Sequence, residues 1–158
     1  MADNNEKPGH LARRFQQIAV AIFHAEVEAA GYDLTPVQYA ALTVVEAHPA
    51  IDQVTLAGLI AYDRTTITGV VDRLVQKGLL QRRANDRDRR VRELLVTDEG
   101  RRILGGIEPA VEAAQRIMMR GLTSKESAEF LRLLHKVIKA GNELSRAPLR
   151  EAVSAAAK

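Results

Sequence analysis

Arginine is concentrated in one short stretch of this sequence. Six arginines lie between Arg82 and Arg92, against two aspartates, Asp86 and Asp88, in a chain whose formal net charge is only +3. Such a local basic cluster is a stronger sign of a nucleic-acid partner than a high overall charge would be. At the tip of a hairpin, arginines suit the minor groove of DNA, where the negative potential is strongest. The candidates for this contact are Arg87, Arg89 and Arg90. The alternative is a solvated charged loop in which the aspartates hold the arginines by ion pairs.

A second polar group lies at the expected start of a helix over residues 64–77, which Asp63 can cap and Gly78 can stop. Apolar residues recur there at helical spacing, at Ile67, Val70, Val71 and Leu74. The polar residues of the first turns are expected to stay free, namely Arg64, Thr65, Thr66 and Thr68. Arginine can read guanine through two hydrogen bonds, and a threonine methyl can pack on thymine. Threonine-rich first turns are also ordinary capping chemistry, so an amphipathic helix without a DNA role stays open.

Arg73 lies in the second half of the same helix. Its side chain can pair with Asp72 or with the arginine-rich hairpin, which would make it structural. Alternatively, it contacts a DNA phosphate.

The elements that must position these residues are mostly helical. Helices are expected at about 10–30, from Thr35 to before Pro49, at 55–61, at 64–77, from Thr97 toward Met119 with a bend at Pro109, and from the capping box that begins at Thr123. Two strand-like runs, 79–83 and 93–97, flank the arginine-rich tip. The expected fold is mainly α with a small antiparallel β-hairpin, in the order α-α-α-α-β-β-α-α. A third, minimal strand is expected near Gln53-Val54.

The chain is expected to form a single domain over residues 1–158, as its length indicates. Within it, residues 34–100 form a winged helix-turn-helix lobe, and residues 8–31 and 101–147 form helices that interlock in a dimer. The apolar stripes of these outer helices exceed what one chain can cover, and they include the last helix's Phe130, Leu131, Leu134, Val137 and Ile138.

Composition excludes several other classes of protein. The chain has no cysteine, so disulfides, thiolate nucleophiles and thiolate metal sites are excluded. No apolar run approaches the ~20 residues of a membrane span, and the polar N-terminus lacks a signal core. A cytoplasmic protein without a membrane partner is expected. No glycine-rich nucleotide loop, paired acid-base carboxylates or Ser-His-Asp arrangement stands out, so the chain is not expected to be an enzyme.

The sequence from Asp63 to Gly100 resembles the MarR family of transcriptional regulators. The resemblance rests on Thr65-Thr66-Ile67-Thr68, Val71-Asp72-Arg73-Leu74, Lys77-Gly78-Leu79-Leu80, Arg87-Asp88-Arg89-Arg90 and Val96-Thr97-Asp98-Glu99-Gly100. The start at Leu34 to Tyr39 and the long flanking helices also fit. The resemblance implies a dimer, a recognition helix at 64–77 and a wing that touches the minor groove through 88–90. Two residues depart from the pattern: Asp86 replaces a frequent Pro, and Gly69 replaces a larger polar residue.

The resemblance also implies a site for small aromatic acids between the first two helices and the DNA-binding lobe. The candidates to line it are Arg14, Phe15, His24, Tyr39 and His48. Each histidine can instead be a structural residue. The four histidines, which also include His10 and His135, do not form a spaced ligand set, so neither a metal nor a cofactor is expected.

The leading hypothesis is therefore a ligand-responsive repressor. Its homodimer would present two recognition helices, one helical turn or roughly 34 Å apart, to a pseudo-palindromic operator in double-stranded DNA. A small aromatic or heteroaromatic acid, or its coenzyme A thioester, would release it. The open alternatives are a constitutive or zinc-responsive DNA-binding protein and, less favoured by the residues, a small enzyme on a helical scaffold.

Overall fold

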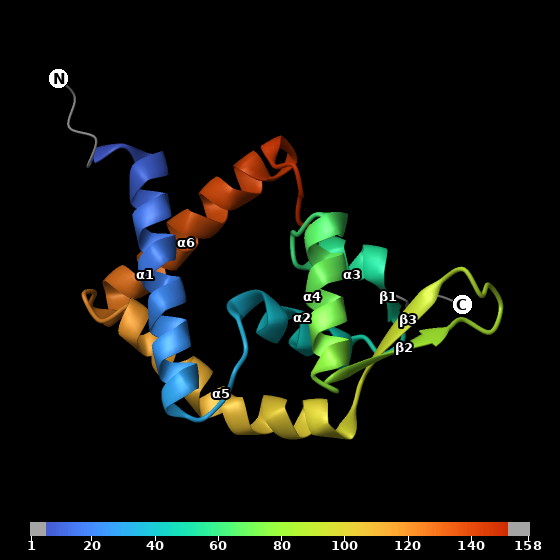
Figure 1. The fold of residues 1–158 in the computed structure, drawn as a ribbon. Helices are drawn as coiled ribbons and strands as arrows, with labels where there is room; N and C mark the ends of the chain where they lie inside the picture. The colour runs from blue at the N-terminus through green and yellow to red at the C-terminus, as the bar shows by residue number, and fades with distance from the viewer. Residues whose placement is uncertain (1–5, 152–158) are drawn as a thin grey trace.

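The computed structural model describes residues 6–151 and is mainly helical, with one small sheet (Figure 1). In chain order, its elements are α1 (Pro8–Ala29), α2 (Pro36–Ala47), β1 (Ile51–Asp52), α3 (Gln53–Leu59), α4 (Arg64–Gln76), β2 (Leu80–Ala84), β3 (Arg92–Val96), α5 (Asp98–Met118), α6 (Ser124–Gly141) and a 3₁₀ turn at Asn142–Leu144. The predicted fold class and element order are confirmed. None of the helices in this part of the chain is long and apolar enough to cross a membrane.

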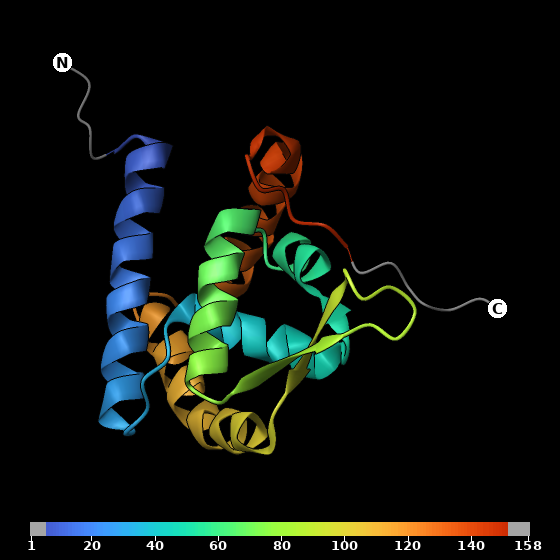
Figure 2. The same ribbon diagram turned by 45° about the vertical axis from the view of Figure 1, so that its right-hand side comes forward.

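The sheet has three antiparallel strands in the order β1-β3-β2. Strands β2 and β3 form the predicted hairpin, which projects away from the helices (Figure 2). The third strand exists, but it lies two residues earlier than predicted, at Ile51–Asp52. Gln53 and Val54 instead begin α3, because the Asp52 side chain accepts a hydrogen bond from the Thr55 amide at 2.9 Å and caps that helix.

Helix ends follow local signals in the sequence. The predicted capping box at the start of α6 forms between Thr123 and Glu126, and Thr35 and Gln38 form a second one at the predicted start of α2. Gly78 has a φ of 71° and lies just after α4, where a left-handed residue ends a helix at little cost. Pro109 lies inside α5, and the two halves of that helix run in different directions in Figure 1. The predicted bend is therefore present.

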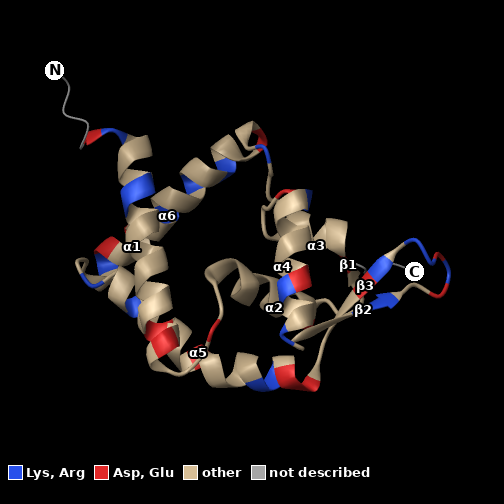
Figure 3. Ribbon diagram, in the orientation of Figure 1, with Lys and Arg blue, Asp and Glu red and all other residues tan. Residues whose placement is uncertain are grey.

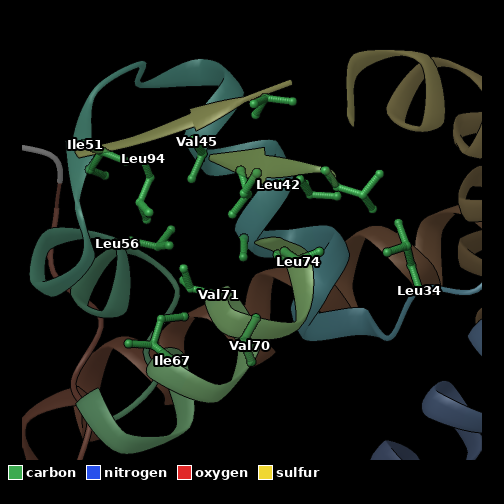
Figure 4. Packing of buried hydrophobic residues seen from close by; sticks show 14 of the residues in the cluster. Leu34, Leu42, Val45, Ile51, Leu56, Ile67, Val70, Val71, Leu74 and Leu94 are labelled. Carbon is green, nitrogen blue, oxygen red and sulfur yellow. The ribbon is translucent and has the colours of Figure 1, made fainter. Parts of the chain in front are cut away.

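The core lies between α2, α3, α4 and the sheet (Figure 4). Its largest fully buried side chains include Leu42, Leu56, Ile67, Leu74, Leu80 and Leu94. The same cluster continues into Phe23 and Val27 of α1 and into Ile107 and Val111 of α5. One continuous core thus joins the winged lobe to the two long helices.

Helix α6 packs loosely against the rest of the single chain. None of its residues is buried, in agreement with the expectation that its apolar stripe exceeds what one chain can cover. The side chain of Val137 is 69% exposed, and Ile138 is 52% exposed. In the second turn of α6, the ring of Phe130 meets that of Phe15 edge-on, with 5.6 Å between the ring centroids. α6 therefore presents a broad apolar face to its surroundings.

The segment after α6, residues 142–151, returns to the winged lobe, and we call it the C-terminal strap (Figure 1). Asn142 exchanges two hydrogen bonds with the backbone of Leu149, at 2.8 and 3.1 Å. The Arg150 amide then donates to the carbonyl of Gly58 on α3 at 2.8 Å. The Arg150 guanidinium pairs with Glu143 at 2.9 Å. The strap thus connects the end of α6 to α3.

Two glycines of α5 test how closely the start of that helix packs against Leu79 and Val96. An added Cβ at Gly100 would lie 2.6 Å from Cγ1 of Val96 and even closer to the carbonyl of Leu79, whereas one at Gly105 would meet nothing within 4 Å. We expect Gly100→Ala to lower the free energy of unfolding by about 1–3 kcal/mol through overpacking. Gly105→Ala should instead raise it, by up to about 1 kcal/mol, because alanine is the better helix former. Urea unfolding followed by circular dichroism measures both, and equal effects of the two variants would contradict the described packing.

Candidate nucleic-acid interface and neighbouring cavity

The first turn of α4 presents two side chains to solvent. Arg64 and Thr65 are exposed, and within residues 6–151 their side chains make no hydrogen bond or ion pair. Asp63 caps the helix by accepting from the amide of Thr66 at 2.9 Å and from its hydroxyl at 2.8 Å. These two bonds hold the pKa of the Asp63 carboxyl below its usual value. The cap therefore stays ionised and occupies the amide end of the helix.

The expectation that Thr66 and Thr68 are free is only partly met. Both residues are exposed, but the Thr66 hydroxyl donates to Asp63. The Thr68 hydroxyl donates to the carbonyl of Arg64 and accepts from Nε2 of Gln53, both at 2.8 Å. Their methyl groups are thus better placed than their hydroxyls for contact with a partner. Gly69 lies on the exposed face of α4, and nothing lies within 4 Å of the place where a Cβ would sit.

Asp72 connects α4 to the hairpin through an ion pair with Arg82 of β2. Arg82 also lies 3.5 Å from Oε1 of Gln53. Arg73 is exposed, and its side chain forms neither of the two predicted pairs within the described chain. Its guanidinium is therefore left for another partner.

The turn between β2 and β3 is closed by Asn85. Its side-chain oxygen accepts from the amides of Arg87 at 2.8 Å and Asp88 at 3.0 Å, which is an Asx turn. Its side-chain amide donates to Glu93 at 2.5 Å, and Arg83 donates to the same carboxylate at 3.0 Å. The hydrogen bonds from Arg83 and Asn85 lower the pKa of Glu93, so its carboxylate stays charged and keeps both partners. The Asx turn orders the tip without the proline that Asp86 replaces.

The arginines of the tip differ in their contacts. Arg90 pairs with Asp88 at 3.2 Å, which fulfils part of the ion-pair expectation. Arg87 and Arg89 are exposed, and their side chains have no ion pair among residues 6–151. Figure 3 shows several basic segments on the projecting hairpin, with acidic ones among them at its tip, and Arg64 is the basic residue in the first turn of α4. The combination of a helix start and a basic hairpin tip suits one groove of DNA and its neighbouring phosphates.

Sequence reasoning missed the residues that support this interface, namely Gln53, Asp72, Arg82, Asn85 and Glu93. Asn85 had a signal, because asparagine two residues before the middle of a tight turn commonly accepts from the backbone. The others act through partners on different elements, so their roles depend on the tertiary fold.

A cavity of about 380 Å³ lies between α1, α2 and α5. Its apolar lining includes Phe15, Val20, Phe23, Tyr39, Val111 and Met118. Gln16 and Gln115 supply side-chain amides. Its size and mostly apolar wall suit a small ring compound.

The structure does not bring the five predicted ligand residues together. Phe15 and Tyr39 line the cavity, but Arg14 lies in an apolar groove between α1 and α6. His48 is at the C-terminal end of α2 and lines a cleft beside α3, far from Tyr39 in the first turn. His24 is exposed, with its ring edge-on to Phe23 at 6.2 Å. Candidates from the same helix, such as Tyr39 in α2 and His48 at its C-terminal end, therefore do not line the same site.

Tyr39 also connects α2 to α5. Its hydroxyl donates to Oε2 of Glu108 at 2.9 Å. Burial raises the pKa of Tyr39, and the bond to Glu108 raises it further. The phenol therefore stays protonated at neutral pH. Across residues 6–151, no group of three or more His, Asp or Glu side chains is placed to hold a metal ion.

The comparisons with known proteins agree on one family. The model of the MarR family matches residues 34–91. The transcriptional repressor NicR of Pseudomonas putida is 32% identical over 136 residues, which is 86% of this chain and 85% of that protein.

Two solved structures share the fold over nearly their full length. The PcaV transcriptional regulator of Streptomyces coelicolor, in complex with its natural ligand, has a TM-score of 0.81 and 33% identity, covering 89% of this chain and 98% of PcaV. BpsR of Bordetella bronchiseptica, whose DNA binding is regulated by 6-hydroxynicotinic acid, has a TM-score of 0.80 and 29% identity, covering 87% of this chain and 96% of BpsR. This family consists of DNA-binding regulators of transcription, not enzymes, as the sequence predicted. The chain belongs to the MarR family of winged helix-turn-helix transcriptional regulators.

Proposed function

We propose that this chain is a homodimeric repressor that a small aromatic or heteroaromatic acid releases from a pseudo-palindromic DNA operator. The observation that carries the proposal is that one hydrophobic core connects α4 with the cavity between α1, α2 and α5. The core that orients α4 also contains Phe23 and Val111, which line the cavity. Ligand binding in the cavity can therefore favour one placement of α4, as release requires. NicR is a repressor, and the DNA binding of BpsR responds to an aromatic acid, which supports the same function here.

In this proposal, α4 enters the major groove with Arg64 and Thr65 at its leading end. Thr66 and Thr68 contribute mainly methyl contacts, and Arg73 contacts a phosphate. The hairpin tip enters the minor groove through Arg87 and Arg89. Arg90 leaves its ion pair with Asp88 and contacts DNA instead. Each arginine that neutralises a phosphate also displaces counterions, so the affinity should fall steeply with salt.

The dimer is proposed from the apolar groove between α1 and α6, which has a volume of about 740 Å³. It is lined by Leu11, Ile18, Phe130, Leu133, Leu134 and Val137. An apolar face of this kind, formed by two long helices, is typical of an obligate interface. We propose that residues 8–31 and 101–147 interlock with a second copy, and that residues 34–100 form the DNA-binding lobe of each protomer.

The proposed effector lies in the cavity with its ring between Phe15, Phe23 and Tyr39. Its carboxylate needs hydrogen-bond donors once it leaves water, and Gln16 and Gln115 offer amides there. Arg14 stays a candidate because it neighbours Phe15 in sequence and lines the groove that a second protomer would cover. His24 and His48 lie away from this cavity and are not included.

The wing is tested with Arg89→Ala, using a duplex selected by the protein from a random DNA pool. We expect weaker binding and a salt slope that is smaller by about 1, because one cation no longer contacts DNA. Fluorescence anisotropy between 50 and 200 mM salt measures both. The control is Arg102→Ala, which removes an arginine that pairs with Glu99 on α5, and it should bind like the wild type. Unchanged affinity in the Arg87→Ala/Arg89→Ala double variant would contradict the wing contact.

The dimer is tested with Val137→Asp, which places a charge on the exposed apolar face of α6. We expect loss of the dimer in sedimentation equilibrium at micromolar concentration, because a carboxylate buried in an apolar interface has no partner. Lys136→Asp is the control, because helical spacing places it away from that stripe. A stable, folded wild-type monomer at these concentrations would refute the proposal.

The effector is tested by thermal shift and by DNA release with a panel of aromatic and heteroaromatic acids and their thioesters. At least one should raise the melting temperature and release DNA. Ala19→Leu should abolish both effects while DNA binding persists, because Ala19 lines the cavity. Ala21→Leu, at an exposed position of α1, is the matched control. If calorimetry detects no binding across the panel, the aromatic effector is excluded.

A further inference from the structure

Gly69 leaves the middle of the exposed face of α4 without a side chain. The buried residues of this helix form its inward stripe, and helical spacing places Gly69 on the opposite side. It lies one turn after Thr65 and one turn before Arg73, both of which are exposed. An added Cβ at Gly69 meets no atom of the described chain within 4 Å. The helix surface therefore has a notch at Gly69, between Thr65 and Arg73, which we call the Gly69 notch.

Nothing in the fold of the described chain requires a glycine at this position. Gly31 and Gly78 have a positive φ, and a Cβ at Gly100 or Gly106 would collide with a backbone carbonyl or a tyrosine ring. Gly69 has an ordinary helical backbone and free space around it, although alanine is the better helix former. A missing Cβ matters most where another molecule approaches the backbone closely. The glycine thus weakens the helix slightly and leaves its outer surface open to such an approach.

The floor of the notch offers carbon and hydrogen atoms and no free polar atom. The backbone amide and carbonyl of a residue inside a helix are paired along the helix. The hydroxyl of Thr68 bonds to the carbonyl of Arg64 and to Gln53, and that of Thr66 donates to Asp63. Both threonines keep their methyl groups as the unpaired part of the side chain. A phosphate oxygen or a polar base edge would therefore find no hydrogen-bond partner on this floor.

Thymine is the base whose major-groove edge suits such a floor. Guanine, adenine and cytosine present hydrogen-bond donors and acceptors there, whereas thymine also presents the methyl group on its C5 atom. A polar edge that leaves water without a new partner loses affinity. A methyl group that leaves water gains affinity, and it needs only the space that a missing Cβ provides.

We propose that the Gly69 notch admits the C5 methyl group of one thymine, so that the chain specifies a T·A pair at that position of each operator half-site. Gly69 determines specificity because it has no side chain there. Thr65 and Arg73, at the two ends of the notch, keep free polar groups for the neighbouring parts of the DNA. The inference rests on the proposed docking of α4 in the major groove and names a base that this helix reads.

The experiment uses the full chain and a duplex that it selects from a random DNA pool. Each thymine is replaced in turn by deoxyuridine, which removes the methyl group and keeps the base pair. At least one position in each half-site should lose about fourfold in affinity, which is the effect of one buried carbon, when measured by fluorescence anisotropy. A C·G pair at that position should also bind more weakly, and methylation of the cytosine at C5 should restore about fourfold.

Gly69→Ala places a methyl group in the notch on the protein instead of on the base. The thymine duplex should bind this variant about threefold or more weakly than the wild type, because two methyl groups compete for one space. The deoxyuridine duplex should bind the variant at least as tightly as it binds the wild type, because the alanine Cβ fills the space that the missing methyl leaves. The thymine-to-uracil ratio of affinities should therefore fall from about four to one or below.

Thermal unfolding separates this effect from a loss of structure. Gly69→Ala should raise the melting temperature by about 2–4 °C, because alanine is the better helix former and the site has room for it. Weaker DNA binding would then accompany a more stable protein. The matched control is Gly105→Ala, the same change at a glycine of α5 with equally free surroundings. It should leave the thymine-to-uracil ratio at about four.

The outcomes distinguish this inference from the function on which it rests. Equal binding of the thymine and deoxyuridine duplexes at every position overturns the notch and leaves the operator-binding function standing. A thymine-to-uracil ratio of four retained in Gly69→Ala overturns the role of Gly69. An equal loss by Gly69→Ala on the selected duplex and on random DNA indicates contact with the phosphate backbone and overturns the base contact. If the chain selects no DNA sequence, this inference and the proposed operator binding are both overturned.

Discussion

The burial of one face of α4 is the constraint on which the rest of the structure depends. Ile67, Val71 and Leu74 are almost completely inaccessible to solvent and pack among α2, α3 and the sheet. Each buried side chain of this size contributes roughly 1.5–3 kcal/mol, so the helix cannot rotate about its axis without a large loss. The exposed face, with Arg64 and Thr65, is thereby directed outward. Leu80 and Leu94 join the same cluster and fix the base of the hairpin in relation to the helix.

Features that depend on nearby residues could be predicted from the sequence. The capping residues Thr35, Asp63 and Thr123 act within three positions of themselves, and all three start a helix as predicted. The hairpin and the buried face of α4 follow from periodicity in the same way. The third strand was misplaced by two residues, since Asp52 both ends that strand and caps α3.

Features that depend on how helices cross could not be predicted. The sequence shows that Arg14 and Phe15 are neighbours, but only the packing of α5 and α6 on α1 shows that Phe15 lines both the cavity and the groove, whereas Arg14 lines the groove and not the cavity. Gln53 lies 15 residues before Thr68, so its bond to that hydroxyl has no local signal. The pairing of Tyr39 with Glu108 spans 69 residues and depends on α5 passing beside α2.

The C-terminal strap closes the chain into a loop, because it brings the end of the described chain back to α3. From α3 the backbone runs through α4, the sheet, α5 and α6, and at Arg150 it returns to Gly58, within hydrogen-bonding distance of its starting point (Figure 1). Leu56, two residues before Gly58, shares a core with Ile67 of α4, so a pull at this junction is transmitted to α4. Movement of the winged lobe away from α6 is consequently coupled to the strap. Such a movement either breaks the 2.8 Å hydrogen bond between the Arg150 amide and the Gly58 carbonyl or moves the end of α6 together with the lobe.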